Sequence, residues 1–231
     1  MSEARVSIRW HGHACFSIVS PRGVRVVIDP FDPAIGYPLP PLEADVVVTT
    51  HNHYDHANVA GLPGQPKVLR GLTADGEWAS VDETVGDVRI RTVGTYHDEV
   101  GGAKRGRNAL VCLDAGGLAV VHCGDLGHAL SDEQVGAVGP VDVAMIPVGN
   151  IYTVGAAEAR EVARQLAPQQ AIVPMHYATE ALAIAIHPVE PFLRGWPSVR
   201  QAETDGVSFP LRPPEGTKPQ VVVLDRRPGG P

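Results

Sequence analysis

Short apolar runs rich in β-branched residues recur through the first half of the chain. Runs of roughly 4–8 such residues, bounded by glycine, proline or polar residues, are typical of strands joined by tight loops. The pattern predicts strands at 6–10, 15–19, 24–28, 46–49, 67–69, 88–93, 110–113 and 118–122. The first half is therefore expected to be mostly β-structure, with the polar segment HNHYDHAN (51–58) leading into a short helix.

The period of the apolar residues changes in the second half, where strands and helices are expected to alternate. The pattern predicts a buried strand at 141–147, a helix at 156–166, a strand at 170–174 and a short helix near 189–195. The proline-rich tail, 212–231, contains the apolar segment 221–224. We expect this tail to be a last edge strand or to be partly disordered.

The chain has 231 residues, a length that fits one large α/β domain over 1–231. Hydrophobic residues make up 44% of the chain, which is enough for a sizeable core. Aromatic residues make up only 5%, so valine, alanine, leucine and isoleucine must form most of that core.

Cellular location is predicted from the start of the chain and from its cysteines. The first residues, MSEARVSIRW, lack the apolar segment of a secretory leader, and no apolar run approaches the roughly 18 residues that cross a bilayer. Cys15, Cys112 and Cys123 are odd in number and lie in apolar stretches, which favours reduced core cysteines over disulfides. We therefore expect a cytoplasmic protein with no membrane partner.

The net charge of −7 bears on the class of partner. A protein that binds nucleic acid broadly needs a basic surface, so the acidic balance disfavours that function and favours a small-molecule substrate. The main basic cluster is Lys104, Arg105 and Arg107 in one glycine-rich loop. This loop would attract a small anionic substrate or simply be solvated, and the sequence also leaves a homo-oligomer open.

The segment VVVTTHNHYDH (46–56) carries the strongest chemical signal in the chain. A buried strand runs directly into His51, His53, Asp55 and His56. If the chain stays extended, His51 and His53 project to the same side. Neutral imidazole and carboxylate are common ligands of zinc, manganese and iron, so this spacing predicts a metal site.

Three further residues each follow a predicted strand. His97 comes after 88–93, Asp125 after 118–122, and His176 after 170–174. A rigid sheet presents residues just beyond its strand ends to a shared site. A lone histidine is usually an ordinary surface or core residue, but this common placement favours additional metal ligands.

These residues, in this order, resemble the ligand series of the metallo-β-lactamase superfamily. The segments IDPF (28–31), RGRNAL (105–110), HCGDLGH (122–128), IPVGNIYT (146–153) and IVPMHY (172–177) resemble a metal-dependent hydrolase branch of it. That branch is also similar to the L-ascorbate-6-phosphate lactonase group. The resemblance covers roughly 5–180 and implies an αββα sandwich, in which two mixed β-sheets are flanked by helices.

The resemblance also implies a binuclear centre with two divalent ions, zinc first and manganese or iron as alternatives. A metal-bound hydroxide would be the nucleophile, and Asp55 would orient it and shuttle its proton. The implied ligands are His51, His53 and His97 for one ion, Asp55, His56 and His176 for the other, and Asp125 as a bridge.

Several other residues are candidates for the substrate pocket or for support of the ligands. Asp29 would hydrogen-bond the ligand loop and fix an imidazole, or cap the turn before Pro30. For the rest a structural role competes with a role at the site, and the candidates are His13, Asn108, His128 and Tyr177. We predict purely structural roles for His11, His122 and Cys123.

The range of expected reactions is smaller than that of the family, because this sequence lacks the features of its nuclease, thioesterase and flavin-containing branches. There is no basic arm for RNA, no helical C-terminal thioesterase domain and no flavin domain. The expected function is hydrolysis of a small-molecule ester, with a lactone favoured by the resemblance. The alternatives are a phosphodiesterase acting on a small phosphate-bearing metabolite and a non-hydrolytic metal-dependent ligand-binding protein.

Overall fold

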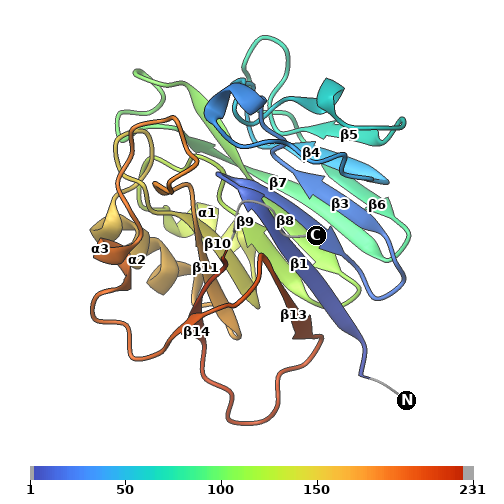
Figure 1. The fold of residues 1–231 in the computed structure, drawn as a ribbon, viewed down its shortest axis with the longest axis vertical. Helices are drawn as coiled ribbons and strands as arrows, with labels where there is room; N and C mark the ends of the chain where they lie inside the picture. The colour runs from blue at the N-terminus through green and yellow to red at the C-terminus, as the bar shows by residue number, and fades with distance from the viewer. Residues whose placement is uncertain (1–2, 226–231) are drawn as a thin grey trace.

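Two β-sheets face each other across the main core of the protein (Figure 1). The computed structural model describes residues 3–225. The first sheet has the strand order β13-β1-β2-β3-β4-β5. Its strands are β1 (Arg5–Gly12), β2 (Cys15–Val19), β3 (Arg25–Ile28), β4 (Val46–Thr49), β5 (Lys67–Arg70) and β13 (Gly206–Pro210). Strands β3, β4 and β5 are parallel and the remaining pairs are antiparallel.

The second sheet has the order β12-β14-β11-β10-β9-β8-β7-β6. Its strands are β6 (Asp82–Val85), β7 (Val88–Tyr96), β8 (Arg107–Ala115), β9 (Ala119–His122), β10 (Val143–Pro147), β11 (Ala171–Met175), β12 (Val199–Gln201) and β14 (Gln220–Val223). Pairing is antiparallel from β6 to β9 and parallel from β9 to β12. Both sheets are therefore mixed, as the resemblance to the metallo-β-lactamase superfamily implied.

Alternation along the strands explains how the first sheet contributes to two cores. In β3, Val26 and Ile28 join the main core, whereas Val27 joins a smaller cluster with Phe31 and Ile35. Successive side chains of a strand point to opposite faces, so both faces of this sheet are buried at β3 and β4. That accounts for continuous apolar runs such as VVVT in β4.

The helices are few. The α-helices are α1 (Asp132–Val138), α2 (Ala156–Leu166) and α3 (Glu190–Leu193), and two 3-10 helices are η1 (Pro33–Ile35) and η2 (Val59–Gly61). Helix α1 packs against β7, α2 against β10, and α3 against α2, so all three lie on the side of the second sheet (Figure 1). On the first sheet, the smaller cluster includes residues of both 3-10 helices. The metallo-β-lactamase sandwich fold is confirmed, with 3-10 helices and loops where flanking α-helices were expected on this side.

Some elements differ from the sequence-based expectation. The segment expected as an edge strand is β14, which lies between β11 and β12, so the edge position is wrong. All three residues of β12 are exposed, so it lacks the apolar pattern that would have predicted it as the true edge. The short α1 was also missed, although its capping box of Ser131 and Gln134 is visible as a sequence motif. Residues 226–231 of the tail lie outside the described residues.

The structure bears on the state of the cysteines and on the presence of membrane-spanning helices. Cys15, Cys112 and Cys123 are all buried and free, as expected for core cysteines. Within residues 3–225, the helices are all too short or too polar to span a bilayer.

Candidate metal centre

Loops at the ends of four strands bring histidine and aspartate side chains together. The first donor group is His51, His53 and His97, and the second donor group is His13, Asp55, His56 and His176. Within each group, one ligand atom from every residue lies within 4.8 Å of the others. The residues of the first group follow β4 and β7, and those of the second follow β1, β4 and β11.

Asp125, which follows β9, lies between the two donor groups. Its Oδ2 is 3.2 Å from His97 Nε2 of the first group and 3.2 Å from His176 Nε2 of the second. Its Oδ1 is 3.2 Å from His56 Nε2. The side chain is 2% exposed, so these contacts are shielded from solvent. The structure thus brings together all seven residues that the sequence singled out as ligands.

The spacing and partners of these donors fit metal ions. Two ligands of a tetrahedral ion at 2.0–2.1 Å are separated by about 3.3 Å, close to the distances around Asp125. His51 Nε2, His56 Nε2 and Asp125 Oδ1 are buried and make no hydrogen bond among the described residues, although the last two atoms lie 3.2 Å apart. Unpaired buried polar atoms are costly, and a bound cation would satisfy all three.

Hydrogen bonds on the far side of three imidazoles fix their tautomers. His56 Nδ1 donates to Asp29 Oδ2 at 2.8 Å, and His97 Nδ1 donates to the Tyr152 carbonyl at 3.1 Å. The Thr50 hydroxyl donates to Asp29, so it accepts from His51 Nδ1, 2.9 Å away. In its neutral form each ring therefore presents the lone pair of Nε2 to the centre, which is the usual arrangement of a metal-binding histidine.

Asp29 connects two of the ligands from a fully buried position at the end of β3. Its Oδ1 accepts the backbone N–H of Thr50 at 2.7 Å, and its Oδ2 accepts both the Thr50 hydroxyl and His56 Nδ1. One carboxylate thus fixes the start of the ligand loop and the orientation of His56. Of the roles the sequence left open for Asp29, these contacts match support of the ligands.

Backbone strain is concentrated at the centre. Only five non-glycine residues within 3–225 have positive φ, and three of them are His13 (53°), Asp29 (48°) and His176 (51°). Such conformations cost about 1–3 kcal/mol each and persist where the surrounding structure imposes them. The strain therefore lies where side chains must be aimed at one point.

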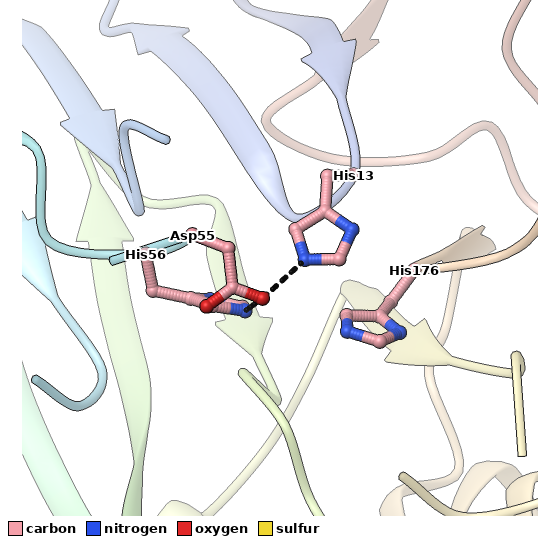
Figure 2. A group of neighbouring side chains, drawn as sticks. All are labelled: His13, Asp55, His56 and His176. Carbon is pink, nitrogen blue, oxygen red and sulfur yellow. Dashed lines mark hydrogen bonds and ion pairs between the residues drawn. The ribbon is translucent and has the colours of Figure 1, made fainter. Parts of the chain in front are cut away.

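Figure 2 shows how His13 enters the second donor group. The His13 ring lies between Asp55 and His176, and its Nε2 is 3.2 Å from Asp55 Oδ2. The ring centroids of His13 and His176 are 4.1 Å apart. The sequence left His13 open between a role at the substrate pocket or ligands and a structural role, and the structure places it in the second donor group.

Burial and neighbouring charges set the protonation of these groups. Burial lowers the pKa of His51 well below its usual value and lowers that of His13 to about 4. Burial alone would also lower the pKa of His56, but the nearby carboxylates Asp125 and Asp29 raise it well above its usual value. Burial alone would raise the pKa of Asp125, but the surrounding imidazoles hold it well below its usual range.

The remaining candidates lie around the centre in different ways. Asn108 is fully buried, and its Oδ1 accepts the backbone N–H of Asp125 at 3.0 Å. His128 is in neither donor group; its Nε2 accepts the backbone N–H of Tyr96, next to His97. Tyr177 packs against Trp10, with ring centroids 5.2 Å apart. Asn108 and His128 thus contact the backbone near ligands, and Tyr177 packs in the core.

Some supporting residues were missed by sequence reasoning. Thr50, directly before the histidine motif, contacts both Asp29 and His51. Asp98, directly after His97, accepts four backbone N–H groups of the loop that ends at Arg105. Adjacency to a ligand was the available signal for both, but sequence alone does not show where such side chains point.

Comparison with known proteins identifies the family. A family model for the β-lactamase superfamily domain matches residues 7–176, which hold every residue of the two donor groups and Asp125. A UPF0173 metal-dependent hydrolase of Thermoplasma volcanium is 31% identical over 192 residues, covering 75% of this chain and 84% of that protein. The chain belongs to the UPF0173 metal-dependent hydrolases of the metallo-β-lactamase superfamily. A family member from Methanoculleus marisnigri is 32% identical, covering 74% of this chain and 81% of that protein.

Solved structures agree with this family assignment. A candidate Zn-dependent hydrolase of the metallo-β-lactamase superfamily from Thermotoga maritima has a TM-score of 0.74 and 34% identity, covering 95% of this chain and all of that one (100%). The short form of human tRNase Z, at 12% identity and a TM-score of 0.55, shares the fold, covering 79% of this chain and 96% of that one. The chain is thus a metal-dependent hydrolase with a His/Asp cluster able to bind metal.

Proposed function

We propose that this hydrolase binds two divalent metal ions and cleaves a small-molecule ester, a lactone in first place. The observation that carries the proposal is the position of Asp125, whose two oxygens lie 3.2 Å from imidazoles of both donor groups. A carboxylate placed in this way can bridge two ions. His51, His53 and His97 of the first donor group would hold one ion. Asp55, His56 and His176 of the second donor group would hold the other.

The proposed chemistry divides between the ions and the chain. When bound, two divalent cations lower the pKa of water towards neutrality and polarise a carbonyl or phosphoryl oxygen. The chain supplies orientation: Asp29, Thr50 and the Tyr152 carbonyl hold imidazoles by hydrogen bonds to Nδ1. The side chain of Asp55 is 14% exposed, so its carboxylate can carry a proton between the centre and solvent.

Zinc is the first choice of metal, with manganese or iron as alternatives. The donors are imidazole nitrogens and carboxylate oxygens, which suit all three ions. The three cysteines are not in either donor group, so thiolate softness does not select zinc. The choice therefore needs a direct comparison of the metal-loaded forms.

The basic loop bears on the choice between a lactone and a phosphodiester. Lys104 pairs with Glu99, and Arg107 pairs with Glu77, so a neighbouring carboxylate offsets each of these two charges. Arg105 instead donates to the Ile151 carbonyl and lies over the Tyr152 ring, beside a cavity that includes His97. Because the loop charge is largely neutralised, a lactone remains the first proposal and a phosphodiester the second.

The remaining parts of the proposal concern partners and location. The net charge of −7 favours a small-molecule substrate over nucleic acid. The buried free cysteines support a cytoplasmic location.

The test is a turnover assay with protein loaded with zinc, manganese or iron. A panel of lactones and bis(p-nitrophenyl) phosphate would be compared, with His51→Ala as the variant lacking a ligand. We expect metal-dependent lactone hydrolysis that falls by more than about 100-fold in His51→Ala. A preference for the phosphodiester would reverse the ranking. Metal-loaded protein that binds panel members but hydrolyses none would favour a non-hydrolytic ligand-binding protein.

A further inference from the structure

His13 occupies a position that its backbone fixes in several ways. It lies in the turn between β1 and β2, it is fully buried, and its φ is 53°. Its carbonyl accepts the Trp10 indole N–H at 3.0 Å and the backbone N–H of His176 at 3.0 Å. The turn is therefore tied both to β1 and to the loop that carries a predicted ligand.

The His13 ring has one polar contact at the centre. Its Nε2 is 3.2 Å from Asp55 Oδ2, and its Nδ1 is buried with no hydrogen-bond partner within residues 3–225. A neutral imidazole carries one proton, and that proton gains a partner only on Nε2. His13 Nε2–H thus donates to the carboxylate.

This tautomer is opposite to that of three of the proposed ligand histidines, His51, His56 and His97. His51, His56 and His97 each use Nδ1–H towards an acceptor outside the centre and leave Nε2 bare. His13 has no acceptor on Nδ1 and directs its proton inward. The contrast separates His13 from these three rings. His176 also has no hydrogen-bond partner on Nδ1 within residues 3–225, but its Nε2 faces Asp125 at 3.2 Å, whereas His13 faces Asp55.

We propose that His13 is a positioning residue that holds Asp55 in the orientation required to bind the second ion (Figure 2). The proposal rests on the proposed function, because it assigns His13 to the binuclear centre. Within residues 3–225, no other hydrogen bond reaches the Asp55 carboxylate. Asp55 lies in a turn and is partly exposed, and its ion pair with His56 is long, at 3.8 Å. Without His13 its carboxylate is therefore held less firmly towards His56 and His176.

The first experiment measures metal binding without reference to turnover. Zinc and cobalt would be titrated into metal-free wild type, His13→Ala and His13→Gln, with His11→Gln as a control two residues away. Support from a neighbouring hydrogen bond is worth about 10–100-fold in metal affinity. We expect that loss for one of the two ions in His13→Ala, partial recovery in His13→Gln because its amide can donate, and wild-type affinity in His11→Gln.

The cobalt spectrum separates positioning from direct coordination. If His13 only positions Asp55, then His13→Ala saturated with cobalt has the same absorption bands as wild type. Bands that shift at saturation would make His13 a ligand and overturn the proposal. Wild-type affinity for both ions in His13→Ala would also overturn it while leaving the proposed function intact, whereas wild type that bound fewer than two ions would overturn both.

A second readout needs no metal. Nitrogen-15 NMR of the metal-free protein distinguishes the tautomers of its histidines. We expect His13 protonated at Nε2, and His51 and His97 protonated at Nδ1. Protonation of His13 at Nδ1 would contradict the hydrogen bond to Asp55 and overturn the proposal.

Discussion

The two donor groups differ in how firmly the protein holds them. In the second group, Asp29 fixes His56, His13 contacts Asp55, and His13, His56 and His176 are buried. In the first group, His51 and His97 are buried and hydrogen-bonded, but His53 is exposed. A buried and connected group is preorganised for its ion, whereas a group open to solvent can exchange ion or admit substrate. The difference predicts tighter binding of the second ion.

The largest effect on metal binding is expected from removing Asp125, which contacts both donor groups. Asp125→Ala takes away a carboxylate 3.2 Å from His56, His97 and His176, so binding of both ions should be lost. The affinity loss should exceed the roughly 100-fold typical of supporting residues. Elemental analysis after reloading checks this, with circular dichroism to confirm folding. Retention of even one ion at wild-type affinity would show that Asp125 does not bridge the groups.

A smaller effect, larger for the second ion than for the first, is expected from Asp29→Asn, because Asp29 contacts His56 directly and reaches His51 only through Thr50. The amide nitrogen would face the Thr50 hydroxyl or His56 Nδ1–H, so one acceptor is replaced by a donor. We expect about 10–100-fold weaker binding of the second ion in a metal titration. The matched control is Asp87→Asn, because Asp87 also accepts a hydroxyl and a backbone N–H, from Ser20 and Arg22. Equal losses for both ions in Asp29→Asn would remove the asymmetry.

Acidification should destabilise the metal-free protein through the second group. His13 has a pKa of about 4 when folded and 6.5 as its ordinary value, so the unfolded chain binds the proton more readily between these values. Stability is therefore expected to fall as the pH drops from 6.5 to 4, by about 2 kcal/mol at pH 5 for this residue. His56 acts in a separate window, since its raised pKa contributes stability that is lost as the pH rises above 6.5.

Urea unfolding of metal-free wild type and His13→Gln at pH 7 and pH 5 checks this sign. The variant lacks the titrating imidazole, so its stability should depend less on pH over that interval. An equal pH dependence in both proteins would show that His13 is not held neutral in the folded state.

The smallest effect on stability is expected from His53→Ala in the first group. The side chain is exposed, so the free energy of unfolding should change by no more than about 0.5 kcal/mol without metal. Binding of the first ion should weaken while the second is kept. Tyr54→Ala, at a neighbouring residue that is 60% exposed, is the control and should keep both ions. Loss of the second ion in His53→Ala would contradict the separation into two groups.

Much of the fold followed from the period of apolar residues, because most strands are buried on at least one face. Strand β4 was predicted with its observed bounds, Val46–Thr49, since its four residues are all buried. Strand β12 was missed because its residues are exposed and its pairing with β14 depends on distant parts of the chain. Local pattern does not carry such tertiary information.

The site residues also divide into those that the local sequence pattern predicts and those that depend on tertiary contacts. His51, His53 and Asp55 were identifiable because they are adjacent in sequence and follow a buried strand. His13 was harder to assign because its contact with Asp55 joins residues 42 positions apart. Such a contact depends on the packing of the β1–β2 turn against the ligand loop, which only the fold supplies.

The central claim is a binuclear centre, and the number of bound ions tests it most directly. Protein purified without chelator, reloaded with zinc and freed of excess ion would be measured by elemental mass spectrometry against protein concentration. The account predicts about two ions per chain, reduced in His51→Ala. A stoichiometry of one or none under every loading condition with zinc, manganese and iron would contradict it.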